Sequence, residues 1–292
     1  MGIAITAAQA EGQLNPAAIQ EMIGAIPIPP RPEVVHQIQT ELGKAEPNIR
    51  NISNIVSQDI GLTVAVLKVV NSPMFALARK ATSVEQAVGL IGLRHMAILV
   101  TGLSMRGVLR GDSNMLARFF DTSAKRSYAM SQMAKGTKTV DVGLAQMFGL
   151  FCDVGITLLR SRFPNYIDTL KTANADLDRS FTQIEQDAHN TDHALIGAMM
   201  AKSWDLPQTV VLAIRLHHDY QVFMDPKIPR DVSRLIALGL VAEVAIQRFG
   251  RLHSNVEWTK GGDYVAGALV LSPDDIEEWI EQIVEDFAIG ID

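Results

Sequence analysis

The stretch VDVGLAQMFGLFCDVGITLLR, residues 140–160, decides how the fold of this chain is predicted. Its apolar residues recur at helical spacing and keep to one face, so it predicts a helix with a buried side. Asp153 lies in the middle of that helix, among small and apolar residues. A carboxylate in such surroundings is costly unless a cation, a metal or several hydrogen-bond donors meet it. Gly149 and Gly155 would let another backbone approach closely.

Two later stretches contain histidines that are candidate partners for Asp153. His193 lies in TDHALIGAMMAKSWDLP, and the pair His217–His218 lies in VVLAIRLHHDY. One Asp and a few His residues, each on its own helix, can build a metal site inside a helical bundle. Two other interpretations stay open: Asp153 is a buried carboxylate bonded to backbone or to His193, and His193 is a packed core residue. Of His217 and His218, we expect one to point inward and the other outward.

The composition limits the classes of protein to which the chain can belong. The 292 residues are 48% hydrophobic and 20% charged, which is ordinary for a globular protein with a sizeable core. The net charge of −6 argues against a nucleic-acid binder, which usually has a basic face. Cys152 is the only cysteine, so no intrachain disulfide can form, and we expect a reducing, cytoplasmic location. No uninterrupted run of ~18 apolar residues is present and the N-terminus lacks a secretory signal, so we expect no membrane span.

Helical periodicity and helix-ending residues recur along the chain, whereas the sequence contains no strand alternation and no Gly-rich phosphate loop. Two capping boxes are predicted, one at Thr82-Ser83 and one pairing Thr182 with Glu185. The predicted fold class is therefore all-α. We expect helices over about residues 16–25, 33–42, 49–56, 62–70, 84–109 with a pause at Gly92, 115–134, 140–160, 165–177, 184–204 with a break near Asn190, 207–217, 232–249 and 273–287.

Several motifs, in order along the chain, carry a resemblance to a known family. They are IPIPPRPEVV from residue 26, SQDIGLTVAVLKVVNSPMF at 57–75, TSVEQAVGLIGLRHM at 82–96, GLFCDVG at 149–155, TDHALIGAMMAKSWDLP at 191–207 and the His217–His218 pair. Over roughly residues 26–220 the chain resembles the HDOD family, the HD-related output domains of bacterial signalling proteins. The resemblance implies an all-helical fold in two lobes: an HDOD-specific N-terminal lobe over 26–110 and a lobe like the HD phosphohydrolases over 111–220. Residues 1–25 would then be a lead-in helix, and residues 221–292 a C-terminal helical extension.

The resemblance also implies that a metal site has lost ligands. HD phosphohydrolases hold divalent metal with a His, a His-Asp doublet, further His residues and a last Asp. Here the doublet position reads Cys152-Asp153, and the earlier His falls at Thr122. The remaining candidates for a vestigial metal site are Asp153, His193, His217 and His218. We expect either no cofactor or a divalent iron, zinc or manganese ion at low occupancy. As a thiolate Cys152 would favour zinc, although a small core residue is its alternative role.

The function that this resemblance implies is a non-catalytic signalling or regulatory module of a bacterium, acting through protein–protein or ligand-binding surfaces. Candidate surfaces are the groove between the lobes, the proline segment 26–32 and the loop 71–80, where Phe75 is a candidate anchor. Expected partners are signalling proteins and a nucleotide second messenger. The oligomeric state stays open.

The alternative hypothesis is a metal-dependent phosphohydrolase acting on a nucleotide or a cyclic dinucleotide. Two metal ions serve such chemistry best, and this sequence is poor in ligands for two. Lys125, Arg126 and Arg160 are candidates to bind phosphate if they face the site. A third hypothesis keeps nucleotide binding without turnover.

Overall fold

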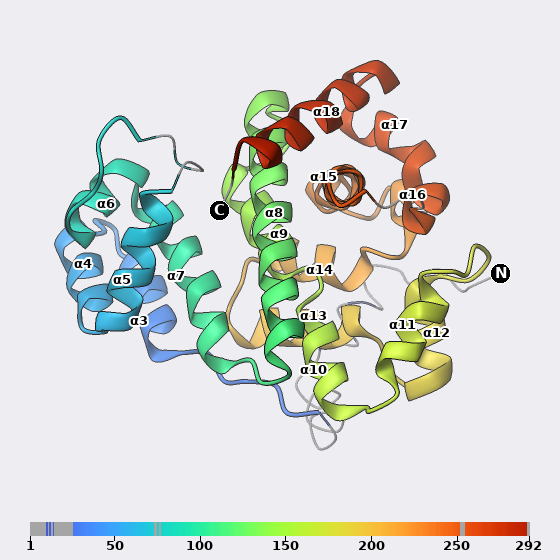
Figure 1. The fold of residues 1–292 in the computed structure, drawn as a ribbon, viewed down its shortest axis with the longest axis horizontal. Helices are drawn as coiled ribbons and strands as arrows, with labels where there is room; N and C mark the ends of the chain where they lie inside the picture. The colour runs from blue at the N-terminus through green and yellow to red at the C-terminus, as the bar shows by residue number, and fades with distance from the viewer. Residues whose placement is uncertain are drawn as a thin grey trace. The chain divides into compact units, whose positions relative to one another are not determined.

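The structure is a computed structural model, and it describes Ala10, Gly12, Leu14 and residues 26–72, 75, 77–251 and 255–290. Throughout these residues the regular elements are helices, without a strand, so the predicted all-α class is confirmed (Figure 1). The predicted helix over 16–25 lies outside the described residues, as do Pro73 and Met74 of the predicted surface loop. The chain divides into two compact units. The smaller contains Pro30–Leu109 and the described residues after Phe287, and the larger contains Arg110–Phe287 and the described residues before Pro30.

The smaller unit contains the helices drawn in blue to cyan in Figure 1. They are α3 (Glu33–Leu42), α4 (Ile49–Ser57), α5 (Ile60–Val70), α6 (Val84–Ile91) and α7 (Leu93–Val108). The apolar positions that the periodicity placed on one face meet in a core that includes the fully buried Ile52, Val56 and Val66. Burial of such side chains from several helices is what holds short helices of this kind together.

Side chains cap the starts of three of these helices. The side chains of Asn48 and Asp59 accept backbone N–H groups at the starts of α4 and α5. Ser83 caps α6 as predicted, whereas the Gln86 side chain accepts the backbone N–H of Thr82 rather than that of Ser83, so the predicted box is formed in part. Gly92 adopts φ 84°, a conformation that favours glycine, and this separates α6 from α7.

The larger unit contains the helices drawn in green to red in Figure 1. They are α8 (Ser113–Thr137), α9 (Val142–Phe151), α10 (Val154–Arg162), α11 (Tyr166–Ala173), α12 (Phe181–His189), α13 (His193–Ser203), α14 (Gln208–Leu216), α15 (Arg230–Phe249), α16 (Val256–Gly261), α17 (Val265–Leu269) and α18 (Pro273–Gly290), with short 3₁₀ turns η2 (Tyr220–Phe223) and η3 (Gly262–Tyr264). Trp204, Tyr166, Phe148 and Phe151 are among its largest fully buried side chains. Helix α15 packs against α8 and α14, so residues after 220 contribute to this core. The domain limits at residues 25, 110 and 220 stay predictions.

The single helix predicted over 140–160 is wrong, because the chain forms two helices there. Cys152 and Asp153 lie between α9 and α10, and Asp153 has φ −103° and ψ 15°, outside helical geometry. Gly155 lies two residues after Asp153. A Cβ at this position would collide with the His193 carbonyl oxygen, so glycine is what lets α10 approach α13 this closely. The break and this close approach together position the residues described below.

The same segment bears on the expectation of no membrane span. By length and composition alone, Val142–Arg162 is apolar enough to cross a membrane, and two bent pairs of helices in the smaller unit pass the same test. Within the structure, 61% of the Val142–Arg162 window is buried. It packs along α8 and α13, so core packing accounts for its apolar sequence.

The predicted capping box of Thr182 with Glu185 is also wrong. Helix α12 begins two residues earlier, and Ser180 is the residue whose side chain accepts a backbone N–H, that of Gln183. Glu185 is thereby one turn inside the helix and is completely buried. Its carboxylate is free to serve another partner, which is a histidine of the site.

Candidate functional site

Asp153 is the centre of a cluster of charged side chains in the larger unit. One of its oxygens, Oδ1, lies 3.8 Å from His193 Nε2 and 3.5 Å from His217 Nε2. The other oxygen, Oδ2, lies 2.7 Å from Nη2 of Arg126. The carboxylate therefore faces two different positive or metal-binding positions, one at each oxygen. The sequence predicted that Asp153 needs such partners, and the structure supplies them from α8, from α13 and from the residue that follows α14.

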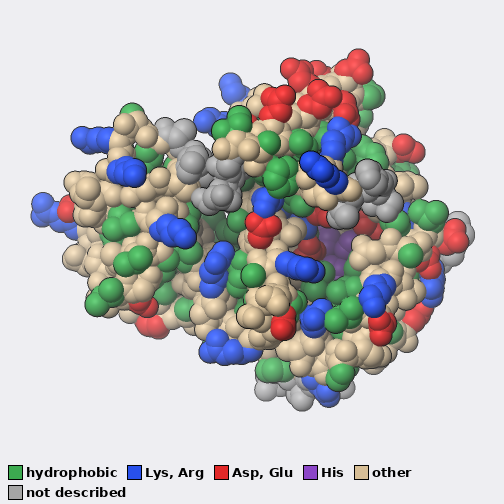
Figure 2. Space-filling view, viewed as in Figure 1, with side chains coloured by type: hydrophobic (Ala, Val, Ile, Leu, Met, Phe, Trp, Pro, Cys, Tyr) green, Lys and Arg blue, Asp and Glu red, His purple; other side chains and the backbone are tan. Residues whose placement is uncertain are grey.

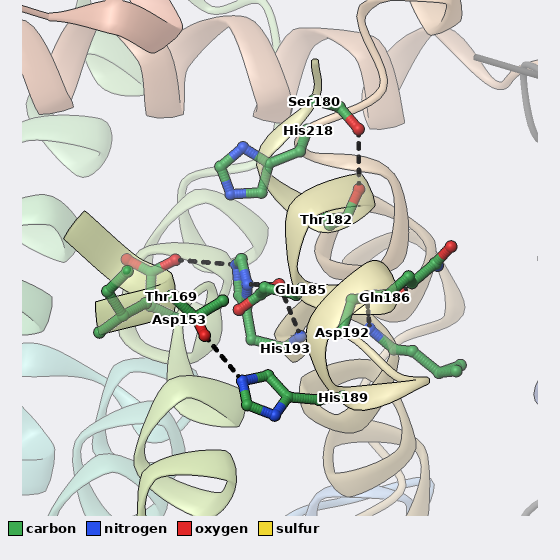
Figure 3. Close-up of polar contacts among 12 residues, drawn as sticks. Asp153, Thr169, Ser180, Thr182, Glu185, Gln186, His189, Asp192, His193 and His218 are labelled. Carbon is green, nitrogen blue, oxygen red and sulfur yellow. Dashed lines mark hydrogen bonds and ion pairs between the residues drawn. The ribbon is translucent and has the colours of Figure 1, made fainter. Parts of the chain in front are cut away.

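His193 and His217 point their Nε2 atoms at one another, 3.2 Å apart. Their other ring nitrogens are held from behind: His193 Nδ1 lies 2.6 Å from Glu185 Oε2, and His217 Nδ1 lies 2.7 Å from the Ile214 carbonyl. Figure 3 shows Glu185 of α12 turned toward His193 of α13. Both Nδ1 atoms face acceptors, so both carry hydrogens. If both rings were neutral, their Nε2 atoms would then point lone pairs at one another and repel. An extra proton or a metal cation between the rings removes that repulsion.

The electrostatics of the cluster supply that proton. Burial would lower the pKa of His193, but the Glu185 carboxylate raises it to about 9. Burial acts in the same direction on His217, where Cys152 and Asp153 raise the pKa to about 10. Burial would raise the pKa of Asp153, yet Arg126 and His217 hold it well below its ordinary value. At neutral pH the cluster therefore contains an ionised Asp153 and at least one imidazolium.

Arg126 is the cation of the other half of the cluster. It lies on α8 with 5% of its surface exposed, and its Nη2 is 2.9 Å from Glu243 Oε2 on α15 as well as 2.7 Å from Asp153. Burial opposes its charge, but the carboxylates of Asp153 and Glu243 raise its pKa further. Of the three basic residues that the sequence offered, Arg126 lines the site. Lys125 instead pairs with Asp121 and lies over the Phe249 ring.

Both histidines of the His217–His218 pair face the site, so the expectation that one points outward is wrong. His218 Nδ1 lies 2.5 Å from Glu257 Oε2, and the Tyr220 hydroxyl donates to the same oxygen at 2.6 Å. The His218 ring stacks on Phe181 with centroids 4.9 Å apart. Burial and the neighbouring His217 lower the pKa of His218, so this ring is neutral and lines the cavity. Glu257 lies on α16, a helix that the sequence did not predict.

The two positions that the family resemblance marks as lost ligands lie differently. Cys152 is buried and lines the cavity beside Asp153 and His217, and one ligand atom from each of the three lies within 4.8 Å of the others. Thr122 is half-buried on α8 and is not among the residues that line the cavity. The α8 residue that reaches Asp153 is Arg126, one helical turn later.

A cavity of about 190 Å³ adjoins the cluster. In Figure 2, histidine side chains are visible at the bottom of a hollow in this part of the surface. Both polar and apolar side chains line it. They are Arg126, Cys152, Asp153, Asn174, His217, His218, Tyr220, Glu243, Gln247 and Glu257, and Phe148, Ile156, Leu170, Phe181, Ile236, Gly239 and Leu240.

The residues present fit one metal ion on the histidine side of Asp153. Three donor atoms, His193 Nε2, His217 Nε2 and Asp153 Oδ1, are separated by 3.2, 3.5 and 3.8 Å. Donors around a tetrahedral zinc lie roughly 3.3–3.6 Å apart. The Nδ1 contacts to Glu185 and to a carbonyl are the support that ligating histidines usually have. On the Arg126 side the guanidinium already lies against Asp153, so the described residues leave no space for a second ion there.

A comparison with known sequences agrees with this architecture. Residues 28–220 match the family described as HDOD domain. The chain belongs to the HDOD domain family. The resemblance drawn from the motifs is therefore confirmed. Among curated proteins, an uncharacterised protein of Treponema pallidum (strain Nichols) is 25% identical over 221 residues, and the uncharacterised protein YuxH of Bacillus subtilis (strain 168) is 24% identical over 125 residues. These matches cover 75% and 43% of this chain but only 42% and 31% of the relatives.

Solved structures share the fold of this HDOD chain. An HDOD domain protein of unknown function from Geobacter sulfurreducens has a TM-score of 0.70 at 21% identity, with 95% of each chain covered. A protein from Shewanella amazonensis SB2B, named as a candidate phosphohydrolase, has a TM-score of 0.70 at 19% identity, covering 93% of this chain and 95% of its own. A candidate signal transduction protein from Marinobacter aquaeolei VT8 has a TM-score of 0.70 at 18% identity, with 97% of this chain and 65% of that chain covered.

Proposed function

We propose that this HDOD chain is a non-catalytic signalling output module whose cavity binds a small ligand without turning it over. The observation that carries the proposal is the Arg126 guanidinium, which lies between Asp153 and Glu243 at 2.7 and 2.9 Å. Efficient metal-dependent phosphodiester hydrolysis uses two ions about 3.5–4 Å apart. Asp153 has only one oxygen left for an ion, so the cluster supports at most one.

Two buried atoms favour ligand binding in the cavity. Arg126 Nη1 and Gln247 Oε1 have no hydrogen-bond partner among the described residues, and both side chains line the cavity. Because both atoms are buried, a ligand in the cavity would satisfy them with an acceptor and a donor once the two side chains turn toward it. Pockets for drug-sized ligands measure about 300–1,000 Å³. The cavity of about 190 Å³ therefore suits a small polar molecule or one moiety of a nucleotide rather than a whole cyclic dinucleotide.

The output of such a module would pass to other signalling proteins in the cytoplasm. In the smaller unit, Ile60 and Val64 lie one helical turn apart on α5 and expose 81% and 62% of their surface. Phe75 is half-buried in the loop that follows this helix. These residues support a contact with a partner protein through that unit.

The second candidate function is a metal-dependent phosphohydrolase using one ion. It is favoured by the three donor atoms of His193, His217 and Asp153, whose spacing fits a single iron, zinc or manganese ion. A bound ion would lower the pKa of a water molecule and so supply hydroxide. In that reaction His193 and His217 would hold the ion as neutral rings, Glu185 would keep the His193 ring in place, and Arg126 would orient an anionic substrate.

A turnover assay separates the two functions. We expect the wild-type chain, supplied with Mn²⁺ or Fe²⁺, to hydrolyse bis-p-nitrophenyl phosphate and a cyclic dinucleotide no faster than the Asp153→Ala variant does. The physical reason is that Arg126 takes the position that a second ion would need. Metal-dependent hydrolysis by the wild type that disappears in Asp153→Ala would overturn the non-catalytic function and establish the phosphohydrolase.

A further inference from the structure

We propose that Arg126 is a built-in cation that takes the position of a metal ion between Asp153 and Glu243, and that its removal uncovers a metal site. The inference rests on the proposed function in one respect, because both assume that Arg126 takes the place of a second ion in the cluster. Nothing in the sequence motifs pointed to Arg126 or to Glu243 in this role.

The first support is the convergence of two carboxylates on one nitrogen. Asp153 Oδ2 and Glu243 Oε2 lie 2.7 and 2.9 Å from the same atom, Nη2 of Arg126. The two acids come from the α9–α10 break and from α15, far apart in the chain. Divalent cations such as Mn²⁺ and Mg²⁺ prefer this kind of oxygen donor set.

The second support is the way in which Asp153 divides its two oxygens. Oδ1 faces the histidine pair, whereas Oδ2 faces Arg126. A carboxylate that bridges two cation positions in this manner is the arrangement of a two-ion site, here with a guanidinium in one position. The guanidinium is also imperfectly bonded, because its buried Nη1 has no partner among the described residues.

The third support is the balance of charge. The Asp153 and Glu243 side chains are 23% and 27% exposed, and Arg126 is the cation that both contact in the described structure. Without it, Glu243 would lose its cation and Asp153 would keep only the histidines at Oδ1, so the two partly buried carboxylates would lack the charge that links them, which is unfavourable. A divalent cation of similar position would restore the balance, so the variant is expected to recruit one.

The experiment measures thermal unfolding of the full chain with and without MnCl₂. We expect the Arg126→Met variant to have a lower Tm than the wild type in metal-free buffer. Mn²⁺ at about 100 times its Kd should then raise the variant's Tm by about 5–10 °C and leave the wild type's unchanged. Atomic absorption after desalting should find manganese retained by the variant only.

Two matched controls locate the effect. Arg126→Lys keeps the positive charge and should show no response to metal. The double variant Arg126→Met/Glu243→Gln loses the carboxylate that belongs to the Arg126 side alone and should lose the response. If Arg126→Met is unfolded without metal, its recovery from urea with and without Mn²⁺ is compared, and recovery only with Mn²⁺ supports the proposal. An equal response of wild type and variant, or no response in either assay, overturns it. Turnover by the wild type would contradict the proposed function only. The present inference is tested separately, by whether Arg126→Met binds Mn²⁺.

Discussion

Gly155→Ala is expected to lower the free energy of unfolding by about 3 kcal/mol, at the upper end of the cost of overpacking. A Cβ at this position would lie 2.0 Å from the His193 carbonyl oxygen and 2.9 Å from the Gly197 nitrogen. Both atoms are backbone, so no side chain can rotate away, and α10 would have to move from α13. Urea denaturation followed by circular dichroism measures the loss.

Gly267→Ala is the matched control for that prediction. Gly267 lies in α17 of the same unit, and a Cβ there would meet no atom within 4 Å. We expect the free energy of unfolding to rise by up to about 1 kcal/mol, because Ala has a higher helix propensity than Gly. If both variants changed stability by the same amount, the close approach of α10 and α13 would not be present in solution.

Glu185→Ala is the second change with a large expected effect, a loss of about 3–5 kcal/mol in the free energy of unfolding. The Glu185 carboxylate is completely buried and bonds the His193 ring, the His193 backbone N–H and the Tyr166 hydroxyl. Its removal leaves a buried imidazolium and a buried hydroxyl without their acceptor. The exposed pair of Glu277 with Arg248 provides the control, since Glu277→Ala should change stability little.

The pH dependence of stability tests the same contact independently. The groups that face His193 are Glu185, Asp153, Asp192 and His217, and together with burial they leave its folded pKa at about 9, against 6.5 for a free imidazole. A pKa raised by folding stabilises the protein fully below pH 6.5, and this stability is lost as pH rises through 9. The difference amounts to no more than about 3 kcal/mol. Glu185→Gln should flatten the decline, and a wild-type stability that is level from pH 6.5 to 9.5 would contradict the assigned contact.

Periodicity and capping predicted most helices correctly because both are local. Ser83 caps α6 three residues ahead, as the sequence predicts, and Asn48 and Asp59 likewise accept backbone N–H groups two and three residues ahead. The break at Cys152–Asp153 has no such signal. Asp153 contacts residues distant in the chain at this point, and the apolar periodicity on both sides conceals the break.

The residues of the candidate site likewise differ in whether a local pattern identifies them. The histidines and Asp153 were found because their residue types are rare inside apolar helices. Glu185 resembled a capping residue, since the spacing from Thr182 satisfies that local pattern. Glu243 and Glu257 resembled the many solvated acids of the chain, such as those exposed along α18, where acidic side chains gather in Figure 2. Only the fold, which pairs Arg126 with a residue 117 positions later, distinguishes them.

The metal content of the purified wild-type protein, prepared without chelators and compared with Asp153→Ala, tests the central claim most directly. The claim is that protons and the Arg126 guanidinium, rather than metal ions, compensate Asp153. It predicts far less than one iron, zinc or manganese per chain in the wild type and the same low content in Asp153→Ala. About one such ion per chain in the wild type, lost in Asp153→Ala, would contradict the claim and favour the one-ion phosphohydrolase.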